Sequence, residues 1–248
     1  DSHSWLGRLN NIRTALQGQQ GDRRLRLGIA GGEWKKMMAD ATARTRFASE
    51  VKKIIEQYEF DGVDFDFEWP ANASEYNNYS ATVIQMRSTL GKYVYFTASL
   101  HPVSFKISPE AIDALDFISY QCYGPAVMRF PYEQFVKDGE AAVAYGIPKN
   151  KLVMGVPFYG STGSLIAAYC DFVNDGLATT NEDTYTYKGN TYTFNSIETI
   201  RKKARYVCEE DYAGIMSWDL ATDIDITNNK SLLKVIKEEF EYYANPTE

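Results

Sequence analysis

Three acidic side chains alternate with apolar ones in the segment 61–70, which reads DGVDFDFEWP. Asp64, Asp66 and Glu68 are two residues apart and share one face of a β-strand, while the valine and phenylalanines between them share the other. The apolar face can pack under helices, so the acids point into the middle of the fold. Three carboxyl groups there cannot all ionise without repulsion and desolvation. The pattern predicts shared protons and a raised pKa for Glu68 at the strand's end, which suits a general acid.

The spacing of these acids also predicts a path for a proton. Successive acids lie roughly 6.5 Å apart along a strand, so reorientation of side chains can pass a proton from the buried end toward the open end. A solvated acidic face and a calcium site are the alternatives. Neither explains the apolar side chains opposite, and the segment has no calcium-loop pattern. We therefore interpret the row as a functional one.

The elements that must hold this row alternate along the chain, with short apolar runs separated by stretches of helical period. This alternation is typical of the α/β class, in which a parallel sheet is built from strand-then-helix units. Helices are expected before and between the strands, beginning with one that Ser4 caps. Strands are expected over residues 25–30, 62–69, 93–100, 116–123, 151–156 and 213–218.

One segment is predicted to leave this sheet. Residues 157–194 lie between the last two strands and contain a small hairpin around Lys188-Gly189-Asn190. The helix that follows is expected to open on a capping box of Asn195 and Glu198. Because the chain has neither a linker nor a sequence repeat, residues 1–248 are interpreted as a single domain.

Composition excludes several classes of partner. The net charge of -7 opposes binding to phosphate backbones, so nucleic acid is not expected as a partner. No apolar run approaches the roughly 18 residues that a membrane span requires. Three cysteines and two histidines offer few metal ligands, so we expect neither a metal nor a cofactor. The 18 tyrosines suit core packing or contacts to sugars.

The segment DGVDFDFE resembles the DxxDxDxE signature of glycoside hydrolase family 18, the chitinases and their relatives. Further segments resemble that family in the same order, and together they cover nearly the whole chain. The resemblance implies a TIM-type (β/α)8 barrel with its site at the carboxyl ends of the strands. These further segments are Gly31-Gly32, QCYG at 121–124, MGVPFYG at 154–160 and GIMSWDLATD at 214–223.

The resemblance also implies roles for individual residues. Glu68 matches the catalytic acid, Asp66 the residue that orients the acetamido group of the substrate, and Asp64 the buried partner of Asp66. Tyr123 matches the tyrosine that binds the acetamido carbonyl, and Trp218 the indole beneath the reacting sugar, although a tryptophan can also plug a barrel core. A structural role is implied for Asp61, Gly31 and Gly32. Further candidates for substrate contact, some of which could simply pack around the barrel mouth, are Gln121, Tyr159, Trp34 and Trp69.

Three departures from the family pattern stand out. Gly124 replaces an Asp that many members carry after the tyrosine. The Ser of the SxGG segment is absent from GIAGG at 28–32, so water is expected to replace a hydroxyl that supports the deepest Asp. Only six strands are found, so the first two strand-helix units are unaccounted for. We expect an upstream segment on the order of 50 residues or more between the exposed edges 25–30 and 213–218.

The function that the resemblance implies is retaining, substrate-assisted hydrolysis of β-1,4-linked N-acetylglucosamine in chitin or chitooligosaccharides, by a secreted enzyme. In such a reaction the acetamido group of the sugar replaces a second carboxylate, and the sequence shows no second carboxylate across the site. Two alternatives remain open. One is an endo-β-N-acetylglucosaminidase that acts on N-glycan cores, and the other is a non-catalytic chitin-binding lectin. Glu68 argues against the lectin.

Overall fold

Six parallel strands form the central sheet of the protein. The computed structural model describes residues 4–17, 22–124, 126–178 and 181–245. All six predicted strands are present, with shifted ends, and the order in the sheet is β1-β2-β3-β4-β5-β10. The α/β class is therefore confirmed. The strands are β1 (Arg26–Gly31), β2 (Gly62–Phe67), β3 (Tyr95–Leu100), β4 (Phe117–Tyr120), β5 (Leu152–Pro157) and β10 (Gly214–Trp218).

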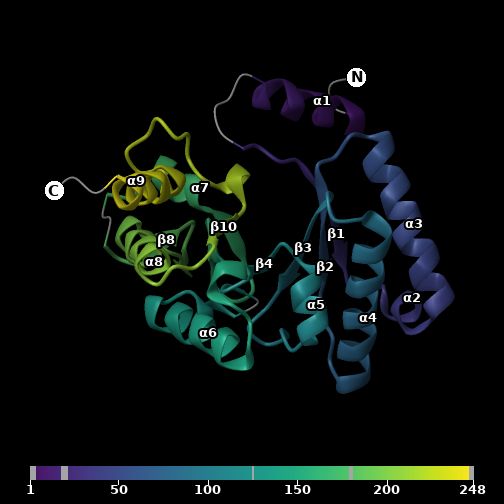
Figure 1. Ribbon diagram of the computed structural model, residues 1–248. Helices are drawn as coiled ribbons and strands as arrows, with labels where there is room; N and C mark the ends of the chain where they lie inside the picture. The colour runs from purple at the N-terminus through teal and green to yellow at the C-terminus, as the bar shows by residue number, and fades with distance from the viewer. Residues whose placement is uncertain (1–3, 18–21, 125, 179–180, 246–248) are drawn as a thin grey trace.

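Helices cover the outer side of this curved sheet (Figure 1). The core lies between the two layers, where Val63, Phe65 and Phe67 of β2 are fully buried, as their alternation predicted. Tyr79 packs on Phe65 with ring centroids 5.4 Å apart, and its hydroxyl donates to the Phe65 carbonyl over 3.0 Å. This packing turns the other face of β2 inward. The outer helices are α3 (Ala41–Gln57), α4 (Ala73–Leu90), α5 (Pro109–Ala114), α6 (Tyr132–Tyr145), α8 (Ile197–Glu209) and α9 (Leu232–Ala244), with short pieces at α2 (Lys35–Ala39), η1 (Val127–Arg129), η2 (Lys149–Lys151) and η3 (Leu220–Thr222).

The sheet is not closed among the residues that the structure describes. There, β1 pairs with β2 alone and β10 with β5 alone, so the two edges are the ones that the sequence predicted. Helix α1 (Trp5–Leu16) begins at Ser4, whose hydroxyl accepts the Gly7 N–H over 3.1 Å as predicted. Trp5 contacts the ring of Tyr58, with centroids 4.8 Å apart, near the start of β2. No helix in the described ranges has the length and apolar character needed to cross a membrane.

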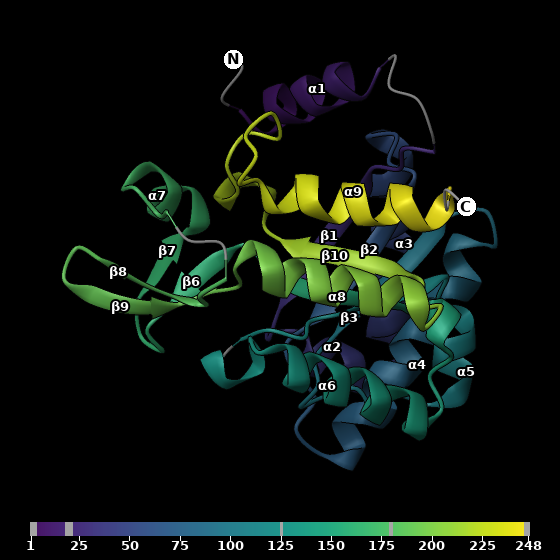
Figure 2. The ribbon, with the colours of Figure 1, turned by 90° about the vertical axis from the view of Figure 1, so that its left-hand side faces the viewer.

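A second, antiparallel sheet follows β5 and projects to one side of the first (Figure 2). Its strand order is β7-β6-β9-β8. The predicted hairpin is present, with Lys188 and Gly189 at positive φ in its turn, as a tight hairpin turn requires. The sequence did not predict the other strands or the short helix of this segment. The elements are β6 (Tyr159–Ser161), β7 (Ile166–Ala168), α7 (Tyr169–Asn174), β8 (Thr184–Tyr187) and β9 (Asn190–Thr193).

The predicted cap of α8 is wrong by one residue. Ser196 is the N-cap, and its hydroxyl accepts the Thr199 N–H over 3.3 Å. Asn195 is buried and used elsewhere, because its amide donates to the Phe130 carbonyl over 2.8 Å and accepts from the Lys203 ammonium over 2.7 Å. Asn195 therefore cannot cap α8, because its side chain is engaged by residues that are distant in the sequence or later in the helix.

Candidate active site

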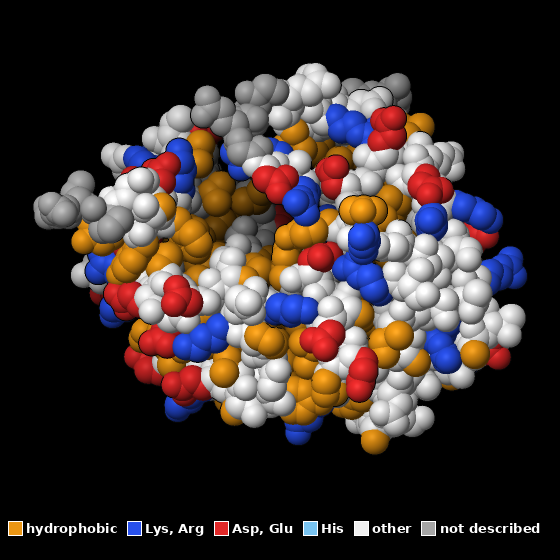
Figure 3. Space-filling model, viewed as in Figure 1, with side chains coloured by type: hydrophobic (Ala, Val, Ile, Leu, Met, Phe, Trp, Pro, Cys, Tyr) orange, Lys and Arg blue, Asp and Glu red, His pale blue; other side chains and the backbone are white. Residues whose placement is uncertain are grey.

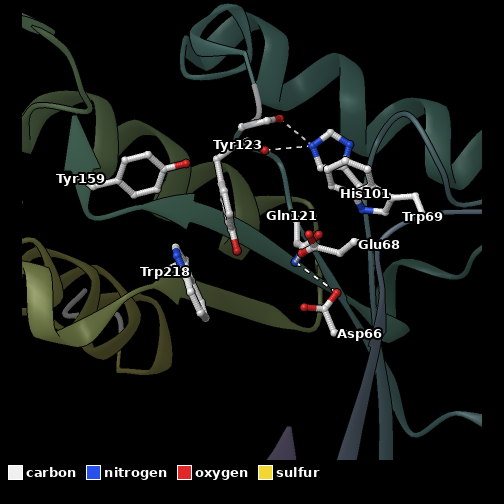
Figure 4. A pocket seen from close by; sticks show the side chains of 9 residues that line it. Asp66, Glu68, Trp69, His101, Gln121, Tyr123, Tyr159 and Trp218 are labelled. Atoms are coloured by element: carbon white, nitrogen blue, oxygen red, sulfur yellow. Dashed lines mark hydrogen bonds between the residues drawn. The ribbon is translucent and has the colours of Figure 1, made fainter. Parts of the chain in front are cut away.

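A cleft of about 310 Å³ lies at the carboxyl ends of the parallel strands. Side chains from several strands converge on it (Figure 4), as expected for a sheet of this class. Most of the residues singled out in the sequence are brought together here. The lining residues are Asp66, Glu68, Trp69, His101, Gln121, Tyr123, Gly124, Tyr159 and Trp218.

Asp64 is the deepest member of the acidic row and is surrounded by donors. The Ser99 hydroxyl donates to it over 2.7 Å, the Thr97 hydroxyl donates to its other oxygen, and an Arg26 guanidinium nitrogen lies 3.3 Å away. Two protein hydroxyls thus support Asp64 in the absence of the Ser of the SxGG segment. Arg26 was not predicted, because it stands within an apolar run that indicated only a buried strand.

Asp66 has a raised pKa. Burial raises its pKa to about 7, the charges of Glu68 and Asp64 add to the shift, and a hydrogen bond from Gln121 opposes it. The Gln121 amide nitrogen lies 3.5 Å from Asp66 and 3.4 Å from Glu68. Asp66 is the middle acid of the row. At neutral pH a proton is therefore readily exchanged at the centre of the row.

Tyr123 presents a hydroxyl group to the cleft. Its ring is buried, which raises the pKa of the phenol and keeps it a hydrogen-bond donor. That hydroxyl donates to the Met216 sulfur over 3.4 Å. Because a thioether is a weak acceptor, the hydroxyl can turn to a stronger acceptor on a ligand. Tyr159 stands edge-on to Tyr123, with ring centroids 6.4 Å apart, and burial raises the Tyr159 pKa to about 12.

The tryptophans singled out in the sequence occupy three different places. Trp218, at the end of β10, is 57% exposed and lines the cleft, so it is not a plug of the core. Trp69 also lines the cleft, and its indole nitrogen is buried without a partner among the described residues. The structure does not bring Trp34 to the cleft. It packs on Phe47, with ring centroids 5.4 Å apart, beneath the helices that follow β1.

The residues expected to be structural support the ends of the strands. At Gly32, a Cβ atom would lie 2.9 Å from the Glu68 carbonyl oxygen, so only glycine allows this close approach. The Gly31 carbonyl accepts the Glu68 N–H over 3.2 Å. At the other end of the strand pair, the Asp61 carboxylate accepts the Leu25 N–H over 2.7 Å.

His101 also lines the cleft, although it is not among the residues singled out in the sequence. It follows the last residue of β3 and is 1% exposed. Its imidazole lies against Trp69, with ring centroids 5.0 Å apart. The available signal was its position, since it directly follows the strand expected at 93–100.

The cleft continues into a second cavity of about 350 Å³ inside the curve of the sheet, and both are lined by Asp66, Gln121, Tyr123 and Trp218. Arg26 and Asp64 line only the inner one. The space-filling view shows the molecule hollowed between the β1 and β10 sides, with apolar side chains on its walls (Figure 3). Within the described ranges, no group of three His, Cys, Asp or Glu side chains is placed to hold a metal ion.

Comparison with known families and curated proteins gives consistent results. The family model described as Glycosyl hydrolases family 18 matches residues 5–223. Probable chitinase 2 of Drosophila melanogaster is 23% identical over 297 residues, which cover 88% of this chain and 60% of that protein. The chain thus spans about three fifths of the length of this relative.

Solved structures show the same fold. The GH18 chitinase ChiB from the chitin utilization locus of Flavobacterium johnsoniae has a TM-score of 0.79 and 25% identity, over 94% of this chain and 79% of that one. The chitinase-like agglutinin RobpsCRA from Robinia pseudoacacia has a TM-score of 0.70 and 18% identity, over 87% and 81%. The sheet and helices described above are therefore those of this barrel fold, with the side between β1 and β10 open in the described residues.

Proposed function

The chain belongs to glycosyl hydrolase family 18, and we propose that it hydrolyses β-1,4-linked N-acetylglucosamine in chitin or chitooligosaccharides with retention of configuration. The observation that carries this proposal is the position of Glu68. Its carboxyl group stands at the carboxyl end of β2, in a cleft that also contains the Tyr123 hydroxyl and the exposed Trp218 indole. An acid beside a donor and a flat apolar surface suits cleavage of a sugar chain.

The nucleophile in the proposed reaction comes from the substrate. Among the described residues, the carboxyl groups that line the cleft are Asp66 and Glu68, both from the β2 segment, so none lies across the cleft to attack the sugar. Glu68 donates its proton to the glycosidic oxygen while the acetamido oxygen attacks C1 and the C1–O bond breaks. The product of this step is an oxazolinium ion. Water then attacks C1 from the opposite face and gives its proton to Glu68, while the bond between C1 and the acetamido oxygen breaks. This step restores both the enzyme and the acetamido group of the sugar.

Asp66 and Tyr123 hold the acetamido group in this scheme. The Tyr123 hydroxyl donates to the acetamido oxygen, and Asp66 accepts from the acetamido N–H. Because the pKa of Asp66 is about 7, a nearby positive charge shifts it readily to the ionised form. The anion then stabilises the oxazolinium as it forms. The substrate must therefore carry an N-acetyl group at the reacting sugar.

A chitin-binding lectin is the second candidate. The Robinia pseudoacacia protein that shares this fold is named a chitinase-like agglutinin, so the fold also occurs in a protein named for binding. The carboxyl group of Glu68, retained at the cleft, favours hydrolysis. Since chitin is an extracellular polymer, the proposed activity also implies a secreted protein.

Hydrolysis of a fluorogenic chitobioside tests the proposal, with Glu68→Gln as the control. We expect turnover by the wild type and near-complete loss in the variant, which keeps the shape of the side chain but has no transferable proton. Both proteins should bind chitooligosaccharides. Binding without turnover by the wild type would identify a lectin. Glycan release from a denatured glycoprotein, seen as a gel shift, in the absence of chitobioside turnover would identify an endoglycosidase.

A further inference from the structure

His101 joins the two segments that carry Glu68 and Tyr123. Its ring contacts Trp69, the residue directly after Glu68. On its other side, the imidazole Nε2 lies 2.9 Å from the Tyr123 carbonyl oxygen and 2.6 Å from the Gly124 carbonyl oxygen (Figure 4). One buried side chain thus spans from the end of β3 to both neighbouring strand ends.

The hydrogen bonds of His101 fix a single state of its ring. Carbonyl oxygens only accept, so Nε2 carries the proton and donates to Tyr123 and Gly124. The Val103 N–H donates to Nδ1 over 3.2 Å, so Nδ1 carries no proton. Both nitrogens are satisfied by the neutral ring, and burial lowers the pKa of His101 accordingly.

The backbone of Tyr123 lies beyond the regular part of the sheet. Strand β4 ends at Tyr120, and the adjoining ladder closes with the Gln121 N–H donating to the Leu100 carbonyl over 2.8 Å. Past that point the chain turns away at Gly124, whose φ is +46°. The Tyr123 side chain has the Met216 sulfur as its polar contact. The direction of its hydroxyl is therefore set by the packing of its ring on Tyr159 and by how its own peptide group is held.

We propose that His101 is a positioning residue that sets the Tyr123 hydroxyl for the acetamido group of the substrate. The inference rests on the proposed function and adds to it a residue that never touches the substrate's reacting atoms. Because Tyr123 acts on the developing intermediate, loss of its alignment should lower kcat more than it raises KM. A histidine that served packing alone would change stability and leave both constants unchanged.

Three variants distinguish the effect of the Nε2–H donor of His101 from the effect of its aromatic ring. His101→Gln places an amide nitrogen at about the position of Nε2 and keeps the donor. His101→Asn has the same chemistry but is too short to reach the two carbonyls. His101→Phe keeps an aromatic ring against Trp69 and has no donor. We expect Gln to stay close to the wild type, while Asn and Phe lose kcat by about 10- to 100-fold with KM changed less than about threefold.

A double-mutant cycle with Tyr123→Phe tests whether the effect passes through the tyrosine. We expect His101→Phe to cost no more than about twofold in kcat when Tyr123 is already Phe. Full loss in both backgrounds would overturn the proposal, as would equal kcat for the Gln, Asn and Phe variants. Melting temperatures of all variants show which changes come from unfolding.

Inhibition by a thiazoline analogue of N-acetylglucosamine distinguishes failure of this inference from failure of the proposed function. The analogue copies the cyclised intermediate, so its affinity reports on Tyr123 even without turnover. An inactive wild type that binds it, with the same dependence on His101 and Tyr123, keeps the inference and rejects hydrolysis. If the wild type is active but the affinity for the analogue is the same in the His101 variants, hydrolysis is supported and the inference about His101 is rejected. A protein that neither binds nor cleaves rejects both.

Discussion

Each acid in the row owes its behaviour to its neighbours, since the side chains themselves are nearly the same. Asp64 faces the Arg26 guanidinium and two hydroxyl groups. Asp66, two residues on, faces other carboxyl groups, and burial raises its pKa to about 7. Arg26 and Asp64 line only the inner cavity, whereas Asp66 also lines the cleft. Unequal surroundings of this kind separate the roles of paired acids.

Asp66→Asn is expected to abolish most activity and to stabilise the folded protein at neutral pH. The folded pKa of about 7 lies above the ordinary value of 3.8, so the folded state keeps a proton that the unfolded chain releases. This contribution is fully present below the unfolded pKa and is lost as the pH rises through about 7. Asn does not titrate, so the variant should melt at a higher temperature than the wild type. The difference between the two melting temperatures should grow between about pH 4 and pH 8.

The control for this experiment is Asp113→Asn, at an exposed carboxyl group of α5. It should shift the melting temperature little at any pH. A difference between Asp66→Asn and the wild type that stays constant with pH would show that Asp66 does not hold a proton in the folded state. Activity equal to the wild type would exclude Asp66 from the proposed mechanism.

The acidic row could be predicted from sequence because its pattern is local, whereas its partners could not. Alternating acids and apolar residues on β2 define two faces without reference to any other segment. Arg26 reaches Asp64 across 38 residues, and His101 reaches Tyr123 across 22. Such contacts depend on strand register and on where each strand ends. The wrong cap prediction at Asn195 has the same cause, because its amide group bonds the Phe130 carbonyl and the Lys203 ammonium.

At the scale of elements, Asp223 fastens the segment after β10 to the start of α9. One carboxylate oxygen accepts from the Ser231 hydroxyl and the Leu233 N–H, each over 2.9 Å, and the other accepts the Leu232 N–H over 3.1 Å. The first turn of a helix offers unpaired N–H groups and a positive dipole end, which suit a partly buried anion such as Asp223. Asp223, the last residue of the segment GIMSWDLATD, thus stabilises the start of α9.

Asp223→Ala should destabilise the protein by about 2 kcal/mol, because several hydrogen bonds to a charged group are lost at a helix start. Urea unfolding measures the loss. Asp225→Ala is the matched control, since Asp225 is exposed and bonds Thr227 within its own turn, and we expect a cost of about 0.5 kcal/mol or less. Equal costs for the two variants would contradict the capping role of Asp223.

At the scale of the whole molecule, the sheet has four strands paired on both sides and two paired on one. In the described part of the chain, β1 and β10 each leave one row of backbone groups outside the ladder. Backbone groups at a sheet edge open more easily than those inside it, and they can pair with another chain. The side opened between them is also where the inner cavity meets the surface.

Hydrogen exchange measured by mass spectrometry should therefore distinguish the inner strands of the sheet from its two edge strands. We expect slow exchange in β2, β3, β4 and β5 and faster exchange in β1 and β10 at low protein concentration. Protection of the two edges that increases with protein concentration would indicate pairing between copies of the chain. Edges as protected as β3 at every concentration would contradict an open sheet.

Gly124 and Tyr159 constrain the routes by which this cleft can evolve. A Cβ atom at Gly124 would lie 3.2 Å from the Tyr159 hydroxyl, and the backbone there has φ of +46°. Tyr159 is in turn held between Tyr123 and Phe130, with ring centroids 6.4 and 5.6 Å away. Restoring the Asp that many family members carry at position 124 is thus crowded while Tyr159 keeps its hydroxyl. We therefore expect the two sites to be epistatic, with Gly124→Asp better tolerated after Tyr159→Phe than before it.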